Sequence, residues 1–139
     1  YKGSAPGMIA LLSGQVSVMV PNLFTSLPHI RAGKLRALGV TTAKRVDALP
    51  ELPAIAETVP GYEFSQWYGV LAPAGTPREI VTRLHVEVAR TLRLPELRAR
   101  LAHDGAEPVG STPEDFAALI RSETVKWAKV VKAAGILPE

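Results

Sequence analysis

Three histidines have side chains whose ordinary pKa suits acid–base chemistry near neutral pH, and the 13 Asp and Glu residues, whose default is a solvated helix face, leave a pair of carboxylates open as an alternative. His29, His85 and His103 are far apart in the chain, and their separations match no metal-binding pattern. The chain has no cysteine, which excludes disulfides, thiolate ligands and cysteine nucleophiles. The sequence also lacks a phosphate loop, a dinucleotide fingerprint and a nucleophile elbow. We therefore expect no enzymatic activity, no metal and no cofactor, and a structural or surface role for each histidine.

Basic side chains are concentrated in the first third of the chain, although the net charge is only +3. The first 46 residues contain no Asp or Glu, and their basic residues are Lys2, Arg31, Lys34, Arg36, Lys44 and Arg45. Such a region can attract anionic ligands, while a solvated basic surface is the more common explanation. No aromatic residue lies between Arg31 and Arg45, where five of these six charges fall, so we expect no binding of nucleic acid.

Length and composition predict a globular protein. The 139 residues, with 47% hydrophobic and 21% charged residues, suit one ordinary domain or part of a larger two-lobed protein. No apolar run approaches the roughly 18 residues that a membrane-spanning helix needs. No signal peptide is visible at Tyr1, so we interpret the sequence as a processed or truncated product.

Strand-like and helix-like segments alternate along the chain. Alternating and β-branched residues predict strands over 16–20, 35–41, 64–72 and 107–109. Capping residues and apolar spacing predict a helix capped by Ser4, a short helix over 24–31, a helical turn near 54–58, a helix capped by Thr76, and helices that begin near Pro95 and Pro113. This order predicts an α/β fold with a mainly parallel sheet.

Several ordered segments resemble one known family, and the likeness extends over essentially the whole chain. The segments are YKGSAP at 1–6, LLSGQVSVM at 11–19, LPHIRAGKLRALGVTTAKR at 27–45, LPELP at 49–53, PGYEFSQWYGVLAPAGTP at 60–77 and GAEPVGSTPEDFAALI at 105–120. Their order and spacing resemble the Bug receptors, the periplasmic solute-binding components of bacterial tripartite tricarboxylate transporters. Members of that family are roughly twice as long, so this sequence resembles their C-terminal half.

The resemblance implies part of a two-lobed type II periplasmic-binding-protein fold, the Venus-flytrap architecture. In that scheme residues 1–65 finish the second lobe, 66–72 form a strand that crosses the hinge, and 73–139 complete the first lobe. The implied function is to bind a small carboxylate in the periplasm and deliver it to membrane permease subunits. A small α/β enzyme or a ligand-sensing regulatory domain is the alternative, since one fold can serve many functions.

Candidate ligand-binding residues follow from the resemblance and from general rules for α/β sheets. Ligands bind at the carboxyl ends of parallel strands, and a helix N-terminus suits a carboxylate. We therefore predict a pocket containing Gly3, Ser4, Asn22 and Ser26, with Tyr1 nearby. Turn and capping roles remain open for Ser4 and Ser26. Alanine variants of Ser4 and Asn22 are expected to weaken ligand binding while leaving the thermal stability of the unliganded protein nearly unchanged.

Aromatic and basic residues provide further candidates. Trp67 and Tyr68 lie on the expected hinge strand and could face the cleft, although packing in a core is the commoner fate of aromatic side chains. The cations Lys2, Arg31 and Lys34 could contact an anion, although a solvated position is more typical. Many relatives have an acid where Pro21 stands here, so a plain carboxylate is favoured over an amino acid.

Residues 73–139 are expected to lack strands for their sheet. The apolar surface left exposed would be covered by a partner copy, a swapped element or the other half of the receptor.

Overall fold

The computed structural model describes residues 3–136, which form five α-helices and one short 3₁₀ helix. They divide into two compact units. Unit 1 contains residues 1–68 and 94–108, and unit 2 contains residues 69–93 and 109–139. No helix in the described part of the chain is long and apolar enough to cross a membrane. The predicted division into lobes at 65 and 72 remains a prediction.

Unit 1 is built on three helices and the 3₁₀ turn, which are α1 (Ser4–Leu12), α2 (Leu23–Arg31), α4 (Pro95–His103) and η1 (Ile55–Glu57). The chain between α2 and η1 folds back on itself, and Val40 forms a parallel bridge with Ala54. All buried hydrophobic residues of the described structure lie in this unit: Met8, Ala10, Leu27, Leu49 and Ala54. Unit 1 therefore holds a small core of its own.

An ion pair closes the loop before η1. Arg45 donates from Nε and Nη2 to the two carboxylate oxygens of Glu57, each at 2.8 Å. Glu57 Oε1 also accepts a bond from the Ala54 N–H at 2.9 Å. The bond from Arg45, followed by that from Ala54, lowers the pKa of Glu57 to about 2. The carboxylate therefore ties the first turn of η1 to the preceding loop.

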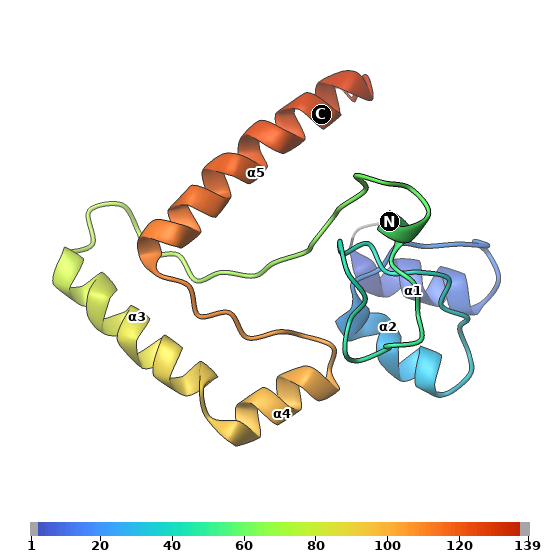
Figure 1. Cartoon of the computed structure of the whole chain (residues 1–139), viewed down its shortest axis with the longest axis horizontal. Helices are drawn as coiled ribbons and strands as arrows, with labels where there is room; N and C mark the ends of the chain where they lie inside the picture. The colour runs from blue at the N-terminus through green and yellow to red at the C-terminus, as the bar shows by residue number, and fades with distance from the viewer. Residues whose placement is uncertain (1–2, 137–139) are drawn as a thin grey trace. The chain divides into compact units, whose positions relative to one another are not determined.

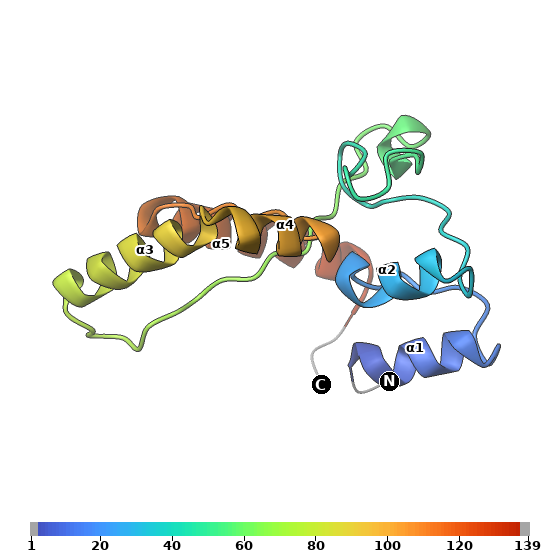
Figure 2. The same cartoon turned by 90° about the horizontal axis from the view of Figure 1, so that it is seen from below.

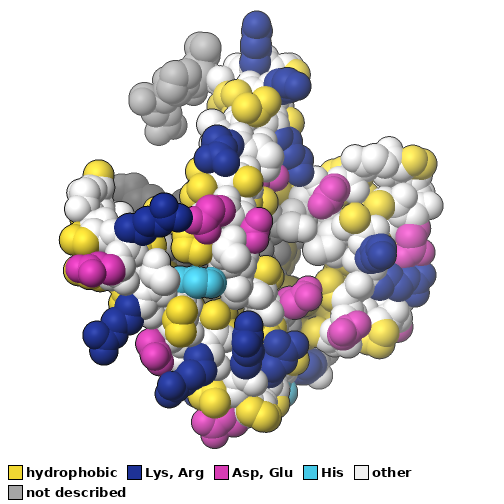
Figure 3. Space-filling view, turned by 60° about the vertical axis from the view of Figure 1, so that its left-hand side comes forward, with side chains coloured by type: hydrophobic (Ala, Val, Ile, Leu, Met, Phe, Trp, Pro, Cys, Tyr) yellow, Lys and Arg dark blue, Asp and Glu magenta, His cyan; other side chains and the backbone are white. Residues whose placement is uncertain are grey.

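Unit 2 consists of α3 (Arg78–Leu92), α5 (Pro113–Ala133) and extended segments beside them. None of its described residues is fully buried. Apolar side chains that would normally pack in a core are exposed here, among them Val70, Leu71, Ile80, Leu84 and Val125. Figure 3 shows hydrophobic side chains at the surface between charged ones. The expected cover of this apolar surface, by a partner copy, a swapped element or the other half of the receptor, remains a prediction.

The helices agree with the sequence prediction, but two predicted caps, Ser4 and Thr76, are wrong. The short helix over 24–31, the turn near 54–58 and the helices after Pro77, Pro95 and Thr112 are all confirmed. Thr112 caps α5 as expected, because its hydroxyl accepts from the Asp115 N–H at 3.1 Å. Thr76 does not cap α3. Its hydroxyl instead donates to the Pro73 carbonyl at 2.8 Å, and Pro77 takes the N-cap position.

The predicted strands do not form a sheet within the described residues. The segments 16–20, 64–72 and 107–109 form no ladder there, and 35–41 makes the Val40–Ala54 bridge and one bond from the Phe64 N–H to the Thr41 carbonyl at 2.8 Å. A strand is defined by hydrogen bonds to a neighbouring strand. Segment 64–72 is drawn as a long stretch of extended chain (Figure 1). These segments therefore lack the pairing that defines a strand.

Candidate functional site

Asn22 begins α2 and acts as its N-cap. The residue has an extended backbone, and its Oδ1 accepts a hydrogen bond from the Thr25 N–H at 2.9 Å. The same oxygen accepts from the Thr25 hydroxyl at 2.8 Å. Both bonds use the carbonyl side of the amide. The NH₂ side of Asn22 is therefore the part of the side chain that can bind something other than α2.

The Tyr68 hydroxyl, on the extended segment in unit 1, accepts from that NH₂ group and from a second amide. Asn22 Nδ2 lies 3.5 Å from the Tyr68 hydroxyl oxygen, at the outer limit of a hydrogen bond. Gln66 Nε2 lies 3.3 Å from the same oxygen. Both amides donate towards Tyr68, so the phenol hydrogen is used in neither contact. Gln66, Tyr68 and Asn22 together form a cluster of neutral donors, called the amide–phenol cluster below.

The N-terminus of α1 lies at the same end of unit 1. Both α1 and α2 begin at this end, as two perpendicular views agree (Figures 1 and 2). Gly3 is the N-cap residue of α1, with φ of 95°, and it supplies no side-chain cap. Ser4 is the first helical residue, which corrects the prediction that Ser4 would be the cap. The first N–H groups and the partial positive charge of each helix favour an anion at this end.

The remaining predicted site residues differ in placement. Ser26 is 5% exposed, and its hydroxyl donates to the Asn22 and Leu23 carbonyl oxygens at 3.0 and 3.3 Å. Its geometry is that of a helix residue bonded to the preceding turn. Trp67 is 40% exposed, and alternation along an extended backbone places it opposite to Gln66 and Tyr68. Tyr1 lies outside the described residues.

Sequence reasoning named Tyr68 as a candidate and missed Gln66. The contact between Asn22 and Tyr68 joins residues 46 positions apart, which no local pattern reveals. Period-two spacing in the extended segment was the available signal, since Gln66 and Tyr68 must share one side of it. The polar residues of that side could have been predicted as one group.

The cations and histidines of unit 1 do not enter the cluster through any hydrogen bond in the described structure. Arg31 Nη1 donates to the His103 carbonyl at 3.0 Å and contacts His103 Nε2 at 3.2 Å. The described residues hold no group of three or more His, Cys, Asp or Glu side chains that could bind a metal ion. The first helix turns therefore present neutral donors rather than ions.

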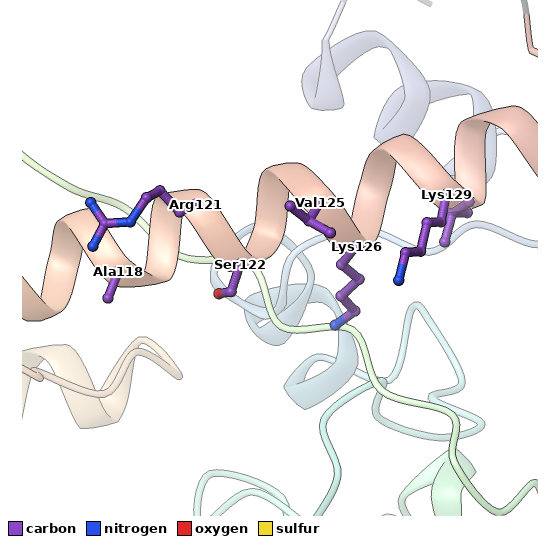
Figure 4. Close-up of a pocket in the computed structure, with 7 residues that line it drawn as sticks. Ala118, Arg121, Ser122, Val125, Lys126 and Lys129 are labelled. Carbon is purple, nitrogen blue, oxygen red and sulfur yellow. The ribbon is translucent and has the colours of Figure 1, made fainter.

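A hollow along α5 in unit 2 is a separate surface feature. It is lined by one helix only, through Ala118, Arg121, Ser122, Val125, Lys126, Lys129 and Val130 (Figure 4). Its charged groups lie on long flexible side chains, Lys126 is paired with Glu123 at 3.6 Å, and the Ser122 hydroxyl donates to the Leu119 carbonyl at 2.8 Å. Nothing in this hollow fixes a ligand in one orientation, so we place the candidate site at the starts of α1 and α2.

Solved structures share the backbone path of this chain. A structure described as R. palustris Rpa4515 with adipate matches with a TM-score of 0.93 and 47% identity, over 100% of this chain and 47% of that one. The periplasmic binding protein BugD matches with a TM-score of 0.91 and 35% identity, over 100% of this chain and 48% of that one. The expected fold class, an α/β periplasmic-binding-protein fold, is confirmed by these neighbours.

Sequence comparison gives the same assignment. Protein BugT of Bordetella pertussis is 36% identical over 136 residues, which are 97% of this chain and 42% of BugT. This chain thus spans less than half the length of BugT and of these two solved structures. The family described as "Tripartite tricarboxylate transporter family receptor" matches residues 1–136. The chain therefore belongs to the receptor family of the tripartite tricarboxylate transporters.

Proposed function

We propose that this chain is part of a periplasmic receptor that captures a small carboxylate and delivers it to the permease subunits of a tripartite tricarboxylate-type transporter. The family consists of receptors rather than enzymes. The observation that carries the carboxylate assignment is the amide–phenol cluster beside two helix N-termini. The description of BugD as a periplasmic binding protein supports the compartment.

The chemistry of the cluster matches a carboxylate. An ionised carboxylate only accepts hydrogen bonds, and it has about four lone-pair sites. The amides of Asn22 and Gln66 each carry two N–H donors, and the Tyr68 hydroxyl carries one. The unbonded N–H groups of the first turns of α1 and α2 add backbone donors. Hydrogen bonds from neutral groups to an ion are stronger than those between neutral partners.

The charge pattern favours a plain carboxylate over an amino acid. Residues 1–46 contain no acidic residue, so this part of the site offers no counter-ion for a ligand ammonium group. A relative solved with adipate, a compound with two carboxylates and no amine, supports the same class. We propose a dicarboxylate, one end of which binds at the starts of α1 and α2.

Isothermal titration calorimetry tests the proposal on the receptor that contains this chain, called the full receptor below. The ligand panel contains adipate, malate, citrate, glutarate and glutamate. We expect one-site binding of at least one dicarboxylate and weaker binding of glutamate than of a dicarboxylate of equal length. Absence of binding to every carboxylate in the panel would overturn the proposal.

A further inference from the structure

We propose that the turn His103–Gly105, at the end of α4, positions the first turn of α2 and thereby the ligand-binding side of Asn22. The inference rests on the proposed function, since it concerns the same site. It assigns Gly105 and Arg31 as positioning residues that do not touch the ligand.

Two features of the structure require glycine at position 105. The first is its backbone, which has φ of +77° and closes the C-terminal turn of α4. The Ala106 N–H donates to the Leu101 carbonyl at 2.8 Å, the pattern of a Schellman motif with glycine at its left-handed position. The second is space. A Cβ at position 105 would lie 2.8 Å from Leu23 Cγ and 3.5 Å from Leu27 Cδ2.

The turn thus packs against α2 next to the proposed site. Leu23 is the first helical residue after Asn22, and Leu27 follows one turn later with only 1% of its surface exposed. Arg31 continues the same face, four residues further on, and donates to the His103 carbonyl at 3.0 Å. Residues spaced by four lie on one side of a helix. One face of α2 is therefore held by the α4 turn along its length.

The His103 ring adds a second polar contact. Arg31 can only donate, so His103 Nε2 accepts at 3.2 Å and the ring hydrogen is placed on Nδ1. Nδ1 lies 3.2 Å from Asp104 Oδ1, which accepts that hydrogen. Arg31, His103 and Asp104 thus form a short chain of hydrogen bonds between α2 and the α4 turn.

α2 needs such support because it is a weak helix by itself. It has 9 residues and contains Pro28 in its interior. Isolated helices shorter than about 12–15 residues are marginal in water. An interior proline also removes a helix hydrogen bond. The position of its first turn, and hence the direction of the Asn22 NH₂ group, depends on packing against the α4 turn.

Gly105→Ala in the full receptor tests this inference, with Gly33→Ala as the matched control. Gly33 ends α2 in the same motif, with φ of +67°, and an added Cβ would have nothing within 4 Å. Both variants strain a left-handed residue, and only Gly105→Ala collides with Leu23. The readouts are the dissociation constant for adipate by calorimetry and hydrogen exchange at Thr25 and Ser26 without ligand.

We expect Gly105→Ala to weaken adipate binding about tenfold or more, as for loss of a bond to a charged ligand. Gly33→Ala should stay within about twofold of the parent. Exchange at Thr25 and Ser26 should rise in Gly105→Ala only. Adding Leu23→Ala removes the collision, so the double variant should bind as Leu23→Ala alone does. Equal affinity and equal exchange in the two glycine variants would overturn the inference.

Arg31→Gln provides a second route if Gly105→Ala fails to fold. Its control is Arg36→Gln, another exposed arginine of unit 1. Exchange at Thr25 should rise in Arg31→Gln relative to Arg36→Gln, and no difference would contradict the inference. If the parent receptor binds no carboxylate, the proposed function is wrong, while the exchange data still decide whether the α4 turn orders α2.

Discussion

The ring of Phe116 lies directly on the backbone of Gly69. A Cβ at position 69 would be 2.0 Å from Phe116 Cζ, a distance that no real side chain could adopt without a shift of the ring. Gly69 belongs to the extended segment and Phe116 to the first turn of α5. Both residues belong to unit 2, which buries none of its described residues fully.

Gly69→Ala is therefore expected to destabilise the full receptor. No left-handed φ is involved at Gly69, so the cost is steric and should be about 1–3 kcal/mol, as for overpacking elsewhere. Chemical denaturation measures it. Gly39→Ala is the control, since its nearest contact would be 3.3 Å, and it should cost less. Combining Gly69→Ala with Phe116→Leu should recover part of the loss, and an additive double variant would contradict the steric explanation.

Replacing Asn22 separates capping from ligand binding. Asn22→Ala removes the bond to the Thr25 N–H, so it should lower stability by about 1 kcal/mol as well as affinity. This revises the expectation that alanine leaves thermal stability unchanged. Asn22→Asp keeps the cap acceptor but replaces the NH₂ donor with an anionic oxygen. It should retain the melting temperature and abolish carboxylate binding in calorimetry. Normal binding by Asn22→Asp would remove this residue from the site.

Tyr68→Phe removes one hydroxyl from the amide–phenol cluster. The side chain is 77% exposed, so the free energy of unfolding should change by no more than about 0.5 kcal/mol. Loss of a bond to a charged ligand costs about 1.5–3 kcal/mol, which corresponds to roughly 10- to 150-fold weaker binding. Tyr62→Phe, on a tyrosine that is 38% exposed, is the control and should bind normally. Equal dissociation constants for the two variants would rule out a contact from the Tyr68 hydroxyl.

The Arg45–Glu57 pair predicts a stability difference that depends on pH. The pKa of Glu57 is lowered from 4.5 to about 2 by its bonds to Arg45 and Ala54. Because the pKa of Glu57 is lower in the folded state than its ordinary value of 4.5, the charged carboxylate stabilises the fold at pH values above 4.5. This stabilisation is lost as the pH falls from 4.5 towards 2. Glu57→Gln keeps an acceptor but removes the charge. The free energy of unfolding of this variant should be lower than that of the parent by a constant amount above pH 4.5, and the difference should become smaller below pH 4.5.

Urea unfolding at several pH values measures this deficit, with Glu51→Gln as a control on an exposed acid nearby. Both partners of the ion pair are half-exposed, so the effect should also fall with added salt. A deficit that stays the same down to pH 2 would show that the charge of Glu57 is not its source.

The helices could be predicted from sequence because their signals are local. Pro95 and Thr112–Pro113 mark helix starts within one turn, and Gly105 and Gly135 mark ends through their left-handed backbone. Thr76 shows the limit of that reasoning. The same hydroxyl could cap α3 or close the preceding turn, and the bond to the Pro73 carbonyl prevailed.

The proposed site, which remains a prediction, could be reasoned from the sequence only in part. Asn22 was expected because it follows an extended segment and precedes a helix, and the structure adds that its amide also caps α2. Its neighbours Gln66 and Tyr68 come from a distant segment, so only folding brings them to Asn22. The pairing of the predicted strands could not be predicted for a similar reason, because it depends on residues that are not adjacent in sequence.

A site made of neutral donors has a consequence for how the receptor would respond to its surroundings. Amide N–H groups, whether from the backbone or from Asn22 and Gln66, do not gain or lose protons when the medium turns acidic. Ligand binding should therefore weaken at low pH only as the ligand itself becomes protonated. The pH at which half of the binding is lost should follow the pKa of each ligand. Such a receptor would respond to the concentration of the ionised ligand. The pH dependence of binding would then be set by the ligand rather than by titration of the receptor.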